Sequence, residues 1–378
     1  MNFDYTDEQE SIRKMVKNYA KEVLAPRAKQ LDENNEFPTE HVQSMGELGL
    51  LGIAYPESVG GVGADSVTEA IAVEEITYGC AATGSILTAH YLGIDGLFLG
   101  GSEEQKQKYL VPGCNGEKLF AFGLTEPVGG TDVGSMKTTA VRDGDYYVLN
   151  GMKHFITNGR YADTIVVYAK TNTSQGNKGI SAFIVENGTD GLSFGAGDDK
   201  MGIRGARTDE VIFEDCYVPV ENRIGEEGDG FKLAMQVVDR GRIGIAAMAV
   251  GLSQAALDAA VQYANERSTF GKPIAQYQGL QWMLAEMKAE LEVSRIYTYY
   301  AAFLKDKGKR ISQEAAIAKL MTSEASQRIV HKAVQIHGGF GYMKEFPVER
   351  FYRDQRILEI FEGTSQIQKI VIASHLLN

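Results

Sequence analysis

A single carboxylate near the C-terminus, Glu362, has surroundings that suit a general base. It follows four apolar residues within 357–361 and precedes a Gly-Thr-Ser sequence that is typical of a helix start. Burial among apolar side chains raises the pKa of a carboxyl group towards the pH at which an enzyme works. Thr364 and Ser365 are good N-caps for a helix expected from Gln366 to Leu377. The local sequence also allows a first-turn acid that only complements the helix dipole.

Residues 122–132, with the sequence FGLTEPVGGTD, form a second segment with the residue types of a ligand-binding turn. Glycines let backbone N–H groups approach a ligand closely, and hydroxyl side chains stand on both sides of them. The segment lacks the Lys-Ser/Thr ending of a P-loop and the spacing of the dinucleotide fingerprint. Taken alone, it is therefore a weak signal for a phosphate-binding loop.

These two segments and five further motifs, in the same order along the chain, closely resemble the acyl-CoA dehydrogenase family. The further motifs are residues 155–159 (FITNG), 200–202 (KMG), 239–242 (DRGR), 266–271 (ERSTFG) and 335–339 (QIHGG). The resemblance covers essentially the whole chain. It implies removal of two hydrogens from adjacent carbons of an acyl-CoA, the α-hydrogen as a proton and the β-hydrogen as a hydride. No side chain accepts a hydride, and the family uses FAD for this purpose.

The resemblance makes Glu362 the catalytic base. One subgroup of the family carries its base at the position of Gly241 instead, and a glycine cannot serve there. The Gly-Arg-Ile-Gly run that starts at Gly241 is most similar to the short-chain, butyryl-CoA type. The resemblance also implies that the Glu362 backbone N–H and a flavin ribityl hydroxyl polarise the thioester carbonyl, which stabilises the enolate-like charge.

The resemblance assigns FAD contacts to several separate segments. The residues are Phe122, Leu124, Thr125, Gly130, Thr131, Phe155, Ile156, Thr157, Arg267, Thr269, Phe270, Gln278, Gln335, Gly338, Gly339, Thr364 and Gln366. The four from Arg267 to Gln278 are implied to reach the FAD of a neighbouring subunit. Many members have tryptophan where this chain has Phe155, a difference expected to alter flavin properties rather than binding. Without the family, Arg267 reads as surface charge and the Gly338-Gly339 pair as a helix end.

Substrate contacts are implied for five residues: Thr131, Asp239, Arg242, Glu362 and Gly363. A guanidinium suits a phosphorylated ligand such as CoA. Asp239 and Arg242 lie three residues apart, so an ion pair within one helix is the alternative interpretation.

The helix expected to wall the acyl pocket carries two titratable residues, His90 and Asp95. They could recognise an unusual acyl group, or they could merely pack. On the same helix, the bulky Tyr91-Leu92 pair predicts a short acyl substrate of about four to six carbons, because large side chains shorten a pocket.

Composition narrows the class of protein. The chain has 378 residues, which is room for two or three domains, and its net charge of −12 argues against a nucleic-acid partner. Three widely spaced cysteines, Cys80, Cys114 and Cys216, predict reduced thiols in a cytoplasmic protein and offer no metal site. No run of about 18 apolar residues and no leader pattern is present, so no membrane span is expected.

The pattern along the chain predicts an α+β protein with three domains. Residues 1–120 read as an N-terminal helical domain, with capping boxes at Thr6-x-x-Gln9 and Ser102-x-x-Gln105. Residues 121–230 read as a β-barrel or sandwich, with a hairpin turn at Asp143-Gly144. Residues 231–378 read as a helical bundle, which the resemblance makes a four-helix bundle. Its expected long helices are 230–267, 276–307 and 312–337, with Trp282, Met283, Met287 and Leu291 as a packing stripe.

Several functional alternatives stay open at this point. The chain could pass electrons to an electron-transfer flavoprotein, or it could be an oxidase that uses oxygen, although such oxidases are usually longer. It could act on a branched, cyclic or dicarboxylic acyl-CoA, or run as an enoyl-CoA reductase. A non-catalytic acyl-CoA-binding scaffold is disfavoured by the presence of Glu362. A homotetramer, built as a dimer of dimers, is expected from the residues implied to reach a neighbour's cofactor.

Overall fold

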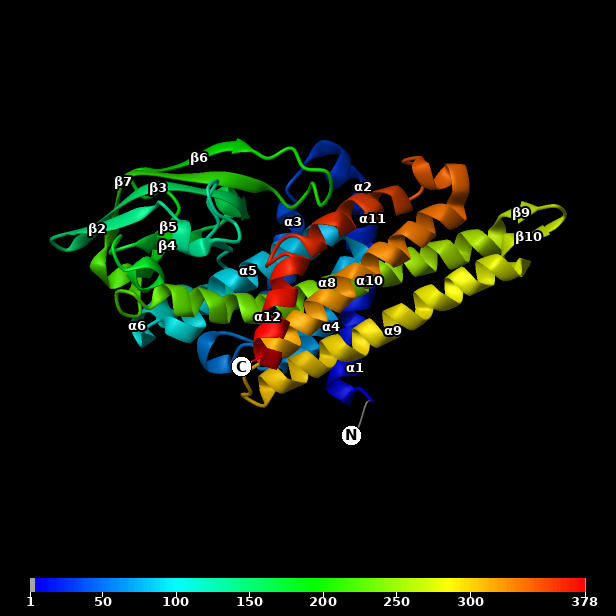
Figure 1. The fold of residues 1–378 in the computed structure, drawn as a ribbon, viewed down its shortest axis with the longest axis horizontal. Helices are drawn as coiled ribbons and strands as arrows, with labels where there is room; N and C mark the ends of the chain where they lie inside the picture. Colours follow the sequence, from blue (N-terminus) through cyan, green and yellow to red (C-terminus); the bar gives the residue numbers. More distant parts are fainter. Residues whose placement is uncertain (1–3, 378) are drawn as a thin grey trace.

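A computed structural model describes residues 4–377 and shows helices, then strands, then helices along the chain (Figure 1). The N-terminal helices are α1 (Asp7–Tyr19), α2 (Ala25–Asn34), α3 (Thr39–Glu47), α4 (Ser66–Gly79), α5 (Ala81–Gly100), α6 (Glu103–Gln105) and α7 (Val111–Cys114). Both predicted capping boxes are confirmed. The Thr6 hydroxyl accepts from the Gln9 N–H at 3.2 Å, and the Gln9 side chain accepts from the Thr6 N–H at 3.0 Å. Ser102 and Gln105 repeat this exchange.

Helix α5 is buried on every side, because it packs against both strand β1 (Phe120–Gly123) and helix α8 (Gly230–Glu266). All of its residues from Ala81 to Leu97 are buried. A helix enclosed in this way is apolar all round and has no polar face to mark its orientation. Its place between the sheet and the C-terminal helices makes it one wall of the site described below.

Eight strands, β1 to β8, form one sheet in the order β6-β7-β3-β2-β4-β5-β8, with β1 paired to β4 off this path, and two further strands pair as a separate hairpin. The remaining strands of the sheet are β2 (Thr139–Asp143), β3 (Tyr146–Thr157), β4 (Thr164–Lys170), β5 (Ile180–Glu186), β6 (Leu192–Gly197), β7 (Thr208–Pro219) and β8 (Arg223–Ile224). The predicted turn at Asp143-Gly144 joins β2 and β3 as an antiparallel hairpin. The part of the sheet made of β6, β7, β3 and β2 joins the part made of β4, β5 and β8 through one residue pair, Thr139 with Lys170. Both parts contribute to one buried apolar core.

The C-terminal region consists of long helices that run side by side (Figure 1). After α8 come β9 (Ser268–Thr269), β10 (Lys272–Pro273), α9 (Gln278–Asp306), α10 (Ser312–His337), α11 (Val348–Gln355) and α12 (Ser365–Leu377). The three long predicted helices agree with α8, α9 and α10 to within two residues at each end. The overall α+β class, helical then β then helical, is therefore confirmed.

Within residues 4–377, one helix, α8, is long and apolar enough to cross a membrane by length and composition. Of its most apolar window, 83% is buried inside the fold. Packing in the protein core therefore accounts for its apolar sequence.

The predicted packing stripe on α9 is only partly correct. Met287 and Leu291 are fully buried, but Trp282 is 61% exposed. Four more large apolar residues of α9 are exposed, namely Val293, Ile296, Tyr300 and Phe303. Apolar spacing marks a helix face that avoids water, but it does not say whether this chain or another molecule covers that face.

Candidate active site

A cavity of about 520 Å³ lies where the three regions meet. Its walls come from α5, from the loop that follows β1, from the end of β3, from the first turns of α8 and from the turn before α12. Nine of the predicted flavin residues line this one cavity: Phe122, Leu124, Thr125, Gly130, Thr131, Phe155, Ile156, Thr157 and Thr364. Glu362, Gly363 and Arg242 line it as well.

The Glu362 side chain reaches this cavity from a tight turn between the last short helical segment, Arg356–Glu359, and α12. Its Oε2 atom is buried and has no hydrogen-bond partner in the described residues. A Cβ atom at Gly241 would lie 3.5 Å from Oε2, an ordinary contact distance, so position 241 on α8 lies beside this carboxylate. Burial raises the pKa of Glu362 to about 7, and the nearby charges of Arg242 and Lys319 oppose that rise.

Hydrogen bonds to side chains hold the turn that carries Glu362. Gln368 Nε2 donates to the carbonyl oxygens of Glu362 at 3.1 Å and Gly363 at 2.8 Å. Lys319 Nζ also donates to the Gly363 carbonyl, at 2.7 Å. The predicted cap at Thr364 is confirmed, because its hydroxyl accepts from the Ile367 N–H at 3.3 Å.

A buried ion pair between Lys153 on β3 and Glu126 holds the glycine-rich loop of residues 122–132 in place. Lys153 Nζ lies 2.7 Å from Glu126 Oε1, and both side chains are almost fully buried. The same amine donates to the Leu124 carbonyl at 3.2 Å. Glu126 also accepts from the backbone N–H groups of Lys137 at 2.5 Å and Thr138 at 3.0 Å. The pair therefore ties the two ends of the loop to β3.

The end of β3 is distorted where it meets the cavity. The register with β7 shifts between Lys153 and Ile156, which marks a bulge, and bulges re-aim side chains near functional sites. Phe155 has a left-handed backbone (φ 60°), is 60% exposed and stacks on His154 with ring centroids 4.0 Å apart. Thr157, two residues further on, lines the cavity.

Of the two predicted substrate residues on α8, Arg242 lines the cavity and Asp239 pairs with it from outside the lining. Arg242 is buried, lines the cavity and has its Nη1 2.5 Å from Asp239 Oδ1. Asp239 does not line the cavity, and its second carboxylate oxygen accepts from the Ser312 hydroxyl. The intrahelical ion pair and a cavity-facing guanidinium are therefore both present.

Along α5, the cavity is lined by Ser85, Thr88, Ala89 and Leu92. The prediction that Tyr91 would join Leu92 in the pocket is wrong, because Tyr91 is turned away and its hydroxyl donates to the Leu50 carbonyl. Successive helix residues point about 100° apart, and on α5 this rotation takes Tyr91 off the face that carries Ser85, Thr88, Ala89 and Leu92.

Neither His90 nor Asp95 lines the cavity, so the packing interpretation holds for both. Nδ1 of His90 accepts from the Phe120 N–H at 3.1 Å, and burial lowers the pKa of this imidazole to about 4. Asp95 accepts from the Tyr55 hydroxyl at 2.8 Å and pairs with Arg240 at 2.7 Å.

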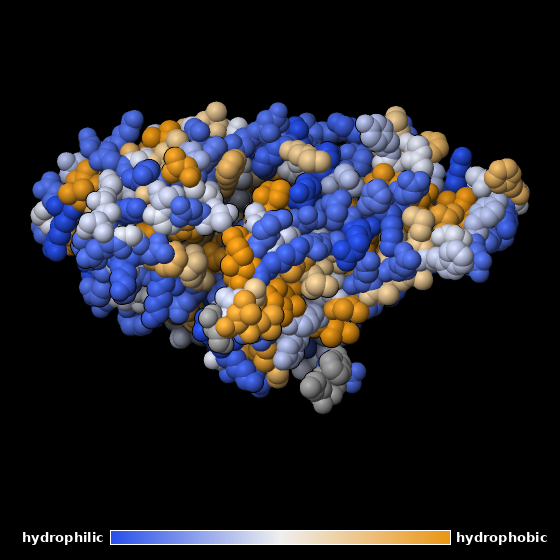
Figure 2. All heavy atoms as spheres, viewed as in Figure 1, coloured by the Kyte–Doolittle hydropathy of each residue, from blue (hydrophilic) through white to orange (hydrophobic). Residues whose placement is uncertain are grey.

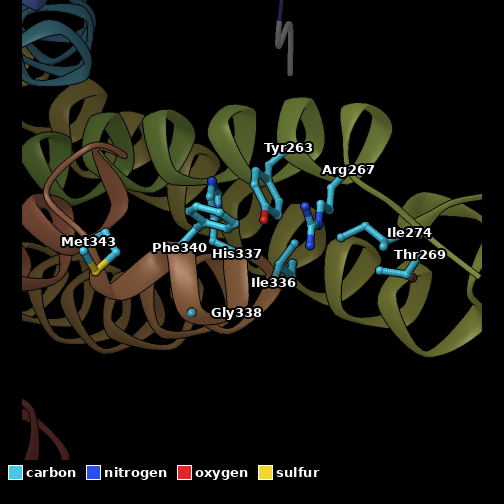
Figure 3. A pocket seen from close by; sticks show the side chains of 10 residues that line it. Tyr263, Arg267, Thr269, Ile274, Ile336, His337, Gly338, Phe340 and Met343 are labelled. Carbon is cyan, nitrogen blue, oxygen red and sulfur yellow. The ribbon is translucent and has the colours of Figure 1, made fainter.

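A second cavity, of about 530 Å³, lies at the far end of the helical bundle (Figure 3). Four predicted cofactor residues line it, namely Arg267, Thr269, Gly338 and Gly339. His337 stacks on Tyr263 with centroids 4.3 Å apart and forms one side (Figure 3). Three other predicted cofactor residues near this end, Phe270, Gln278 and Gln335, are exposed outside its lining, as is Gln366 near the first cavity. The predicted flavin residues thus fall into two groups.

Two features escaped the sequence prediction, namely the support of the loop by Lys153 and the contact of Lys319 with the base turn. Both are lysines inside regular elements, where a charged residue normally indicates a solvated face. Among residues 4–377 there is no group of three or more His, Cys, Asp or Glu side chains that could hold a metal. The three cysteines are free thiols and are buried.

Family profiles for the acyl-CoA dehydrogenase N-terminal, middle and C-terminal domains match residues 6–117, 121–216 and 228–377. The chain belongs to the acyl-CoA dehydrogenase family. The short-chain specific acyl-CoA dehydrogenase of Clostridium acetobutylicum is 48% identical over 377 residues, 100% of each chain. Acryloyl-CoA reductase (NADH) of Anaerotignum propionicum is 45% identical over 379 residues, 100% of this chain and 96% of that protein.

Two solved structures share the whole fold. Butyryl-CoA dehydrogenase from Megasphaera elsdenii superposes with a TM-score of 0.99 at 43% identity, covering 100% of both chains. A chain in a structure of the electron transferring flavoprotein of Acidaminococcus fermentans also superposes with a TM-score of 0.99, at 46% identity and with 100% coverage of both. The family and fold expected from the motifs are confirmed, and the chain is an oxidoreductase that uses FAD.

The first cavity fits a flavin and an acyl group. It combines an apolar wall with the hydroxyls of Thr125, Thr131, Thr157 and Thr364, which can hydrogen-bond a polar ring system. The unpartnered Glu362 Oε2 faces the same space. A polar atom buried without a partner is costly, which indicates that a ligand group normally lies against it.

Proposed function

We propose that this acyl-CoA dehydrogenase converts a short-chain acyl-CoA to the trans-2-enoyl-CoA, with Glu362 as the base. The observation that carries the proposal is the buried, unpartnered Glu362 Oε2 in a cavity shared with the flavin-assigned residues. When bound, FAD supplies the hydride acceptor that side chains lack.

The residues of the cavity have separate tasks in this proposal. Glu362 takes the α-proton, and a pKa of about 7 suits a base that works near neutral pH. Apolar side chains such as Leu92 and Ile360 exclude water, which strengthens the electrostatic interactions within the cavity. The Glu362 backbone N–H polarises the thioester carbonyl, and Arg242, with Thr131 and Gly363, contacts the CoA part of the substrate.

Substrate length depends in this proposal on how α5 and α8 meet. A Cβ atom at Gly241 would lie 2.5 Å from Leu92 Cδ2, so the leucine fills the space above the glycine. We expect kcat/KM to be higher for butyryl-CoA than for octanoyl-CoA or a cyclic acyl-CoA. Each excluded methylene costs the longer substrate about 1–3 kcal/mol of transition-state binding. A clear preference for octanoyl-CoA or the cyclic ester would contradict this assignment.

The matched variants are Leu92→Ala and Leu97→Ala, since Leu97 is buried on the same helix but does not line the cavity. Leu92→Ala is expected to raise the octanoyl-to-butyryl ratio of kcat/KM by about 10-fold or more. Leu97→Ala should leave the ratio unchanged, and because a ratio is independent of the amount of active enzyme, partial unfolding does not disturb the comparison.

We also propose a homotetramer, in which a neighbouring subunit completes the flavin site. The exposed residues Val293, Ile296, Tyr300 and Phe303 of α9 recur at helical spacing, as expected for a helix face covered by another molecule. Figure 2 shows further apolar side chains gathered over α12, where Ile370, Leu376 and Leu377 are exposed. The cavity that contains Arg267 would then receive the adenosine side of the neighbour's FAD.

Light scattering is expected to give about four times the 41.3 kDa mass of one chain. Val293→Glu combined with Ile296→Glu should lower this mass and the bound FAD together, because charge is placed on the apolar face. Val141→Glu, which alters an exposed valine of β2, is the control and should change neither. A monomeric mass with full FAD retention would rule out the shared flavin site.

Electrons pass, in this proposal, to an electron-transfer flavoprotein in the cytoplasm. The relative found in a structure of such a flavoprotein supports this partner. The acryloyl-CoA reductase relative supports physiological operation in the reductive direction as the second candidate. Assays of butyryl-CoA with an oxidised electron-transfer flavoprotein, and of crotonyl-CoA with NADH, distinguish the two by which of these electron carriers supports turnover.

A further inference from the structure

Lys319 is a buried lysine in the middle of α10 that contacts the turn carrying Glu362. Its side chain is fully buried, and its Nζ donates to the Gly363 carbonyl at 2.7 Å. An ammonium group inside a protein must be compensated by hydrogen bonds and opposite charge. The interactions that supply this compensation are therefore the clue to why a lysine occupies this position.

The compensation comes from the base and its turn. Burial lowers the pKa of Lys319 to about 8, and attraction to Glu362 is the largest effect that opposes this change. At neutral pH the amine is therefore mostly charged. The Glu362 carboxylate is in turn favoured by Arg242 and Lys319, and burial disfavours it.

The turn itself needs to be held. Glu362 has φ 52° and Gly363 has φ 89°, so two successive residues adopt the left-handed region that side-chain-bearing residues avoid. Such a conformation persists only when the surroundings enforce it, and it is found most often at functional sites. Lys319 and Gln368 supply that enforcement by binding the carbonyl oxygens of these two residues.

We propose that Lys319 is a positioning residue for the reaction. Its ammonium group fixes the turn that aims Glu362 into the cavity, and its charge stabilises the carboxylate form of the base. The inference rests on the proposed role of Glu362 as the base.

Charged groups from every surrounding element affect the charge states of Glu362 and Lys319. They are Asp239 and Arg242 on α8, Lys319 and Glu324 on α10, Glu359 before the turn and Lys369 on α12. Asp239 is paired with Arg242, and Lys369 is paired with Glu324 at 3.3 Å. Of the cations in this set, Lys319 is the one that both contacts the turn and attracts Glu362.

The test isolates the proton-transfer step. Acetyl-CoA has no β-carbon and cannot lose a hydride, so exchange of its α-protons with D₂O, followed by NMR, reports on the base alone. The FAD-loaded enzyme is compared with Lys319→Met, Lys319→Gln, Lys319→Arg and Gln368→Met across the pH range. Lys332→Met is the control, because it removes a lysine from the same helix that pairs with Glu286 instead.

The expected results separate charge from hydrogen bonding. In Lys319→Met and Lys319→Gln, the pH at which exchange rises should move up by on the order of one unit, because an attractive charge near the base is lost. That shift is roughly a five-fold loss at pH 7. Lys319→Arg keeps the charge and should restore the wild-type midpoint. Gln368→Met should lower the plateau without moving the midpoint, and Lys332→Met should change neither.

Wild-type midpoints in both neutral variants would overturn the proposal, even if their thermal stability fell. Failure of both neutral variants to retain FAD, with Lys319→Arg intact, would assign the charge to folding and would also overturn it. Glu362→Gln distinguishes the two proposals. If that variant exchanges protons at the wild-type rate, the base assignment fails, whereas if exchange is lost and the Lys319 variants keep their midpoints, only this inference fails.

Discussion

Glu362→Gln is expected to fold, bind FAD and bind acyl-CoA, and to lose turnover by roughly 10²–10⁴-fold or more. The amide has the shape of the carboxylate but cannot take the α-proton. The glycine at position 241 leaves no second base at the site that some relatives use. Steady-state kinetics with butyryl-CoA, together with FAD content and a substrate-binding assay, measure the three parts of the prediction.

The control for this variant is Glu359→Gln, which removes a carboxylate three residues earlier that pairs with Arg356. It should retain most of the activity. Because the pKa of Glu362 is raised to about 7, wild-type kcat/KM should rise with pH through that value as the carboxylate forms. The residual activity of Glu362→Gln should lack this rise. Near-wild-type turnover in Glu362→Gln would eliminate it as the base.

Lys153→Met is expected to destabilise the protein by about 3–5 kcal/mol, because it leaves the Glu126 carboxylate buried without its partner. The variant should also lose FAD, since Lys153 holds the Leu124 carbonyl of the glycine-rich loop. Urea unfolding at fixed protein and FAD concentrations measures the first effect, and the flavin absorbance of the purified protein measures the second.

The double variant Glu126→Gln with Lys153→Met is expected to be more stable than Lys153→Met alone. It removes the stranded charge, and residues in direct contact do not show additive effects. Loss of less than about 1 kcal/mol in Lys153→Met, with FAD retained, would show that the buried pair does not support the loop.

The elements that were predicted correctly are those with clear sequence signals at their ends. Helices α8, α9 and α10 begin and end at polar or glycine-rich breaks, so their bounds were predicted to within two residues. The β2–β3 hairpin was predicted from its Asp143-Gly144 turn signal. The short strands β1, β6 and β8 were not predicted, because β8 has only two residues and the glycines of β1 and β6 interrupt any alternation.

Orientation was the part that the sequence could not supply. Tyr91, Leu92 and Asp95 are all buried on α5, yet only Leu92 faces the cavity. A helix enclosed on every side has no polar stripe from which its rotation could be read. Trp282 on α9 was expected inside the bundle but is 61% exposed, because apolar spacing shows that a helix face is apolar and does not show which molecule covers it.

The sequence predicted those site residues whose type and neighbours along the chain already indicate their chemical role. Glu362 was assigned as the base because the Glu-Gly-Thr-Ser-Gln run resembles the family's motif, whereas the local sequence alone also allowed a first-turn acid. Lys319 and Lys153 are functional in this account through contacts with groups far away in the sequence, among them backbone carbonyls 44 and 29 positions away. Such pairs depend on the tertiary fold, and no local pattern encodes them.

Anaerobic mixing with butyryl-CoA tests the central claim most directly. The account predicts rapid bleaching of the oxidised-flavin absorbance in the wild-type enzyme, slowed by at least about 100-fold in Glu362→Gln, with crotonyl-CoA as the product. Admission of air should restore the colour slowly, whereas an oxidase would recover it at the rate of turnover. Binding of butyryl-CoA without bleaching in the wild-type enzyme would contradict the account.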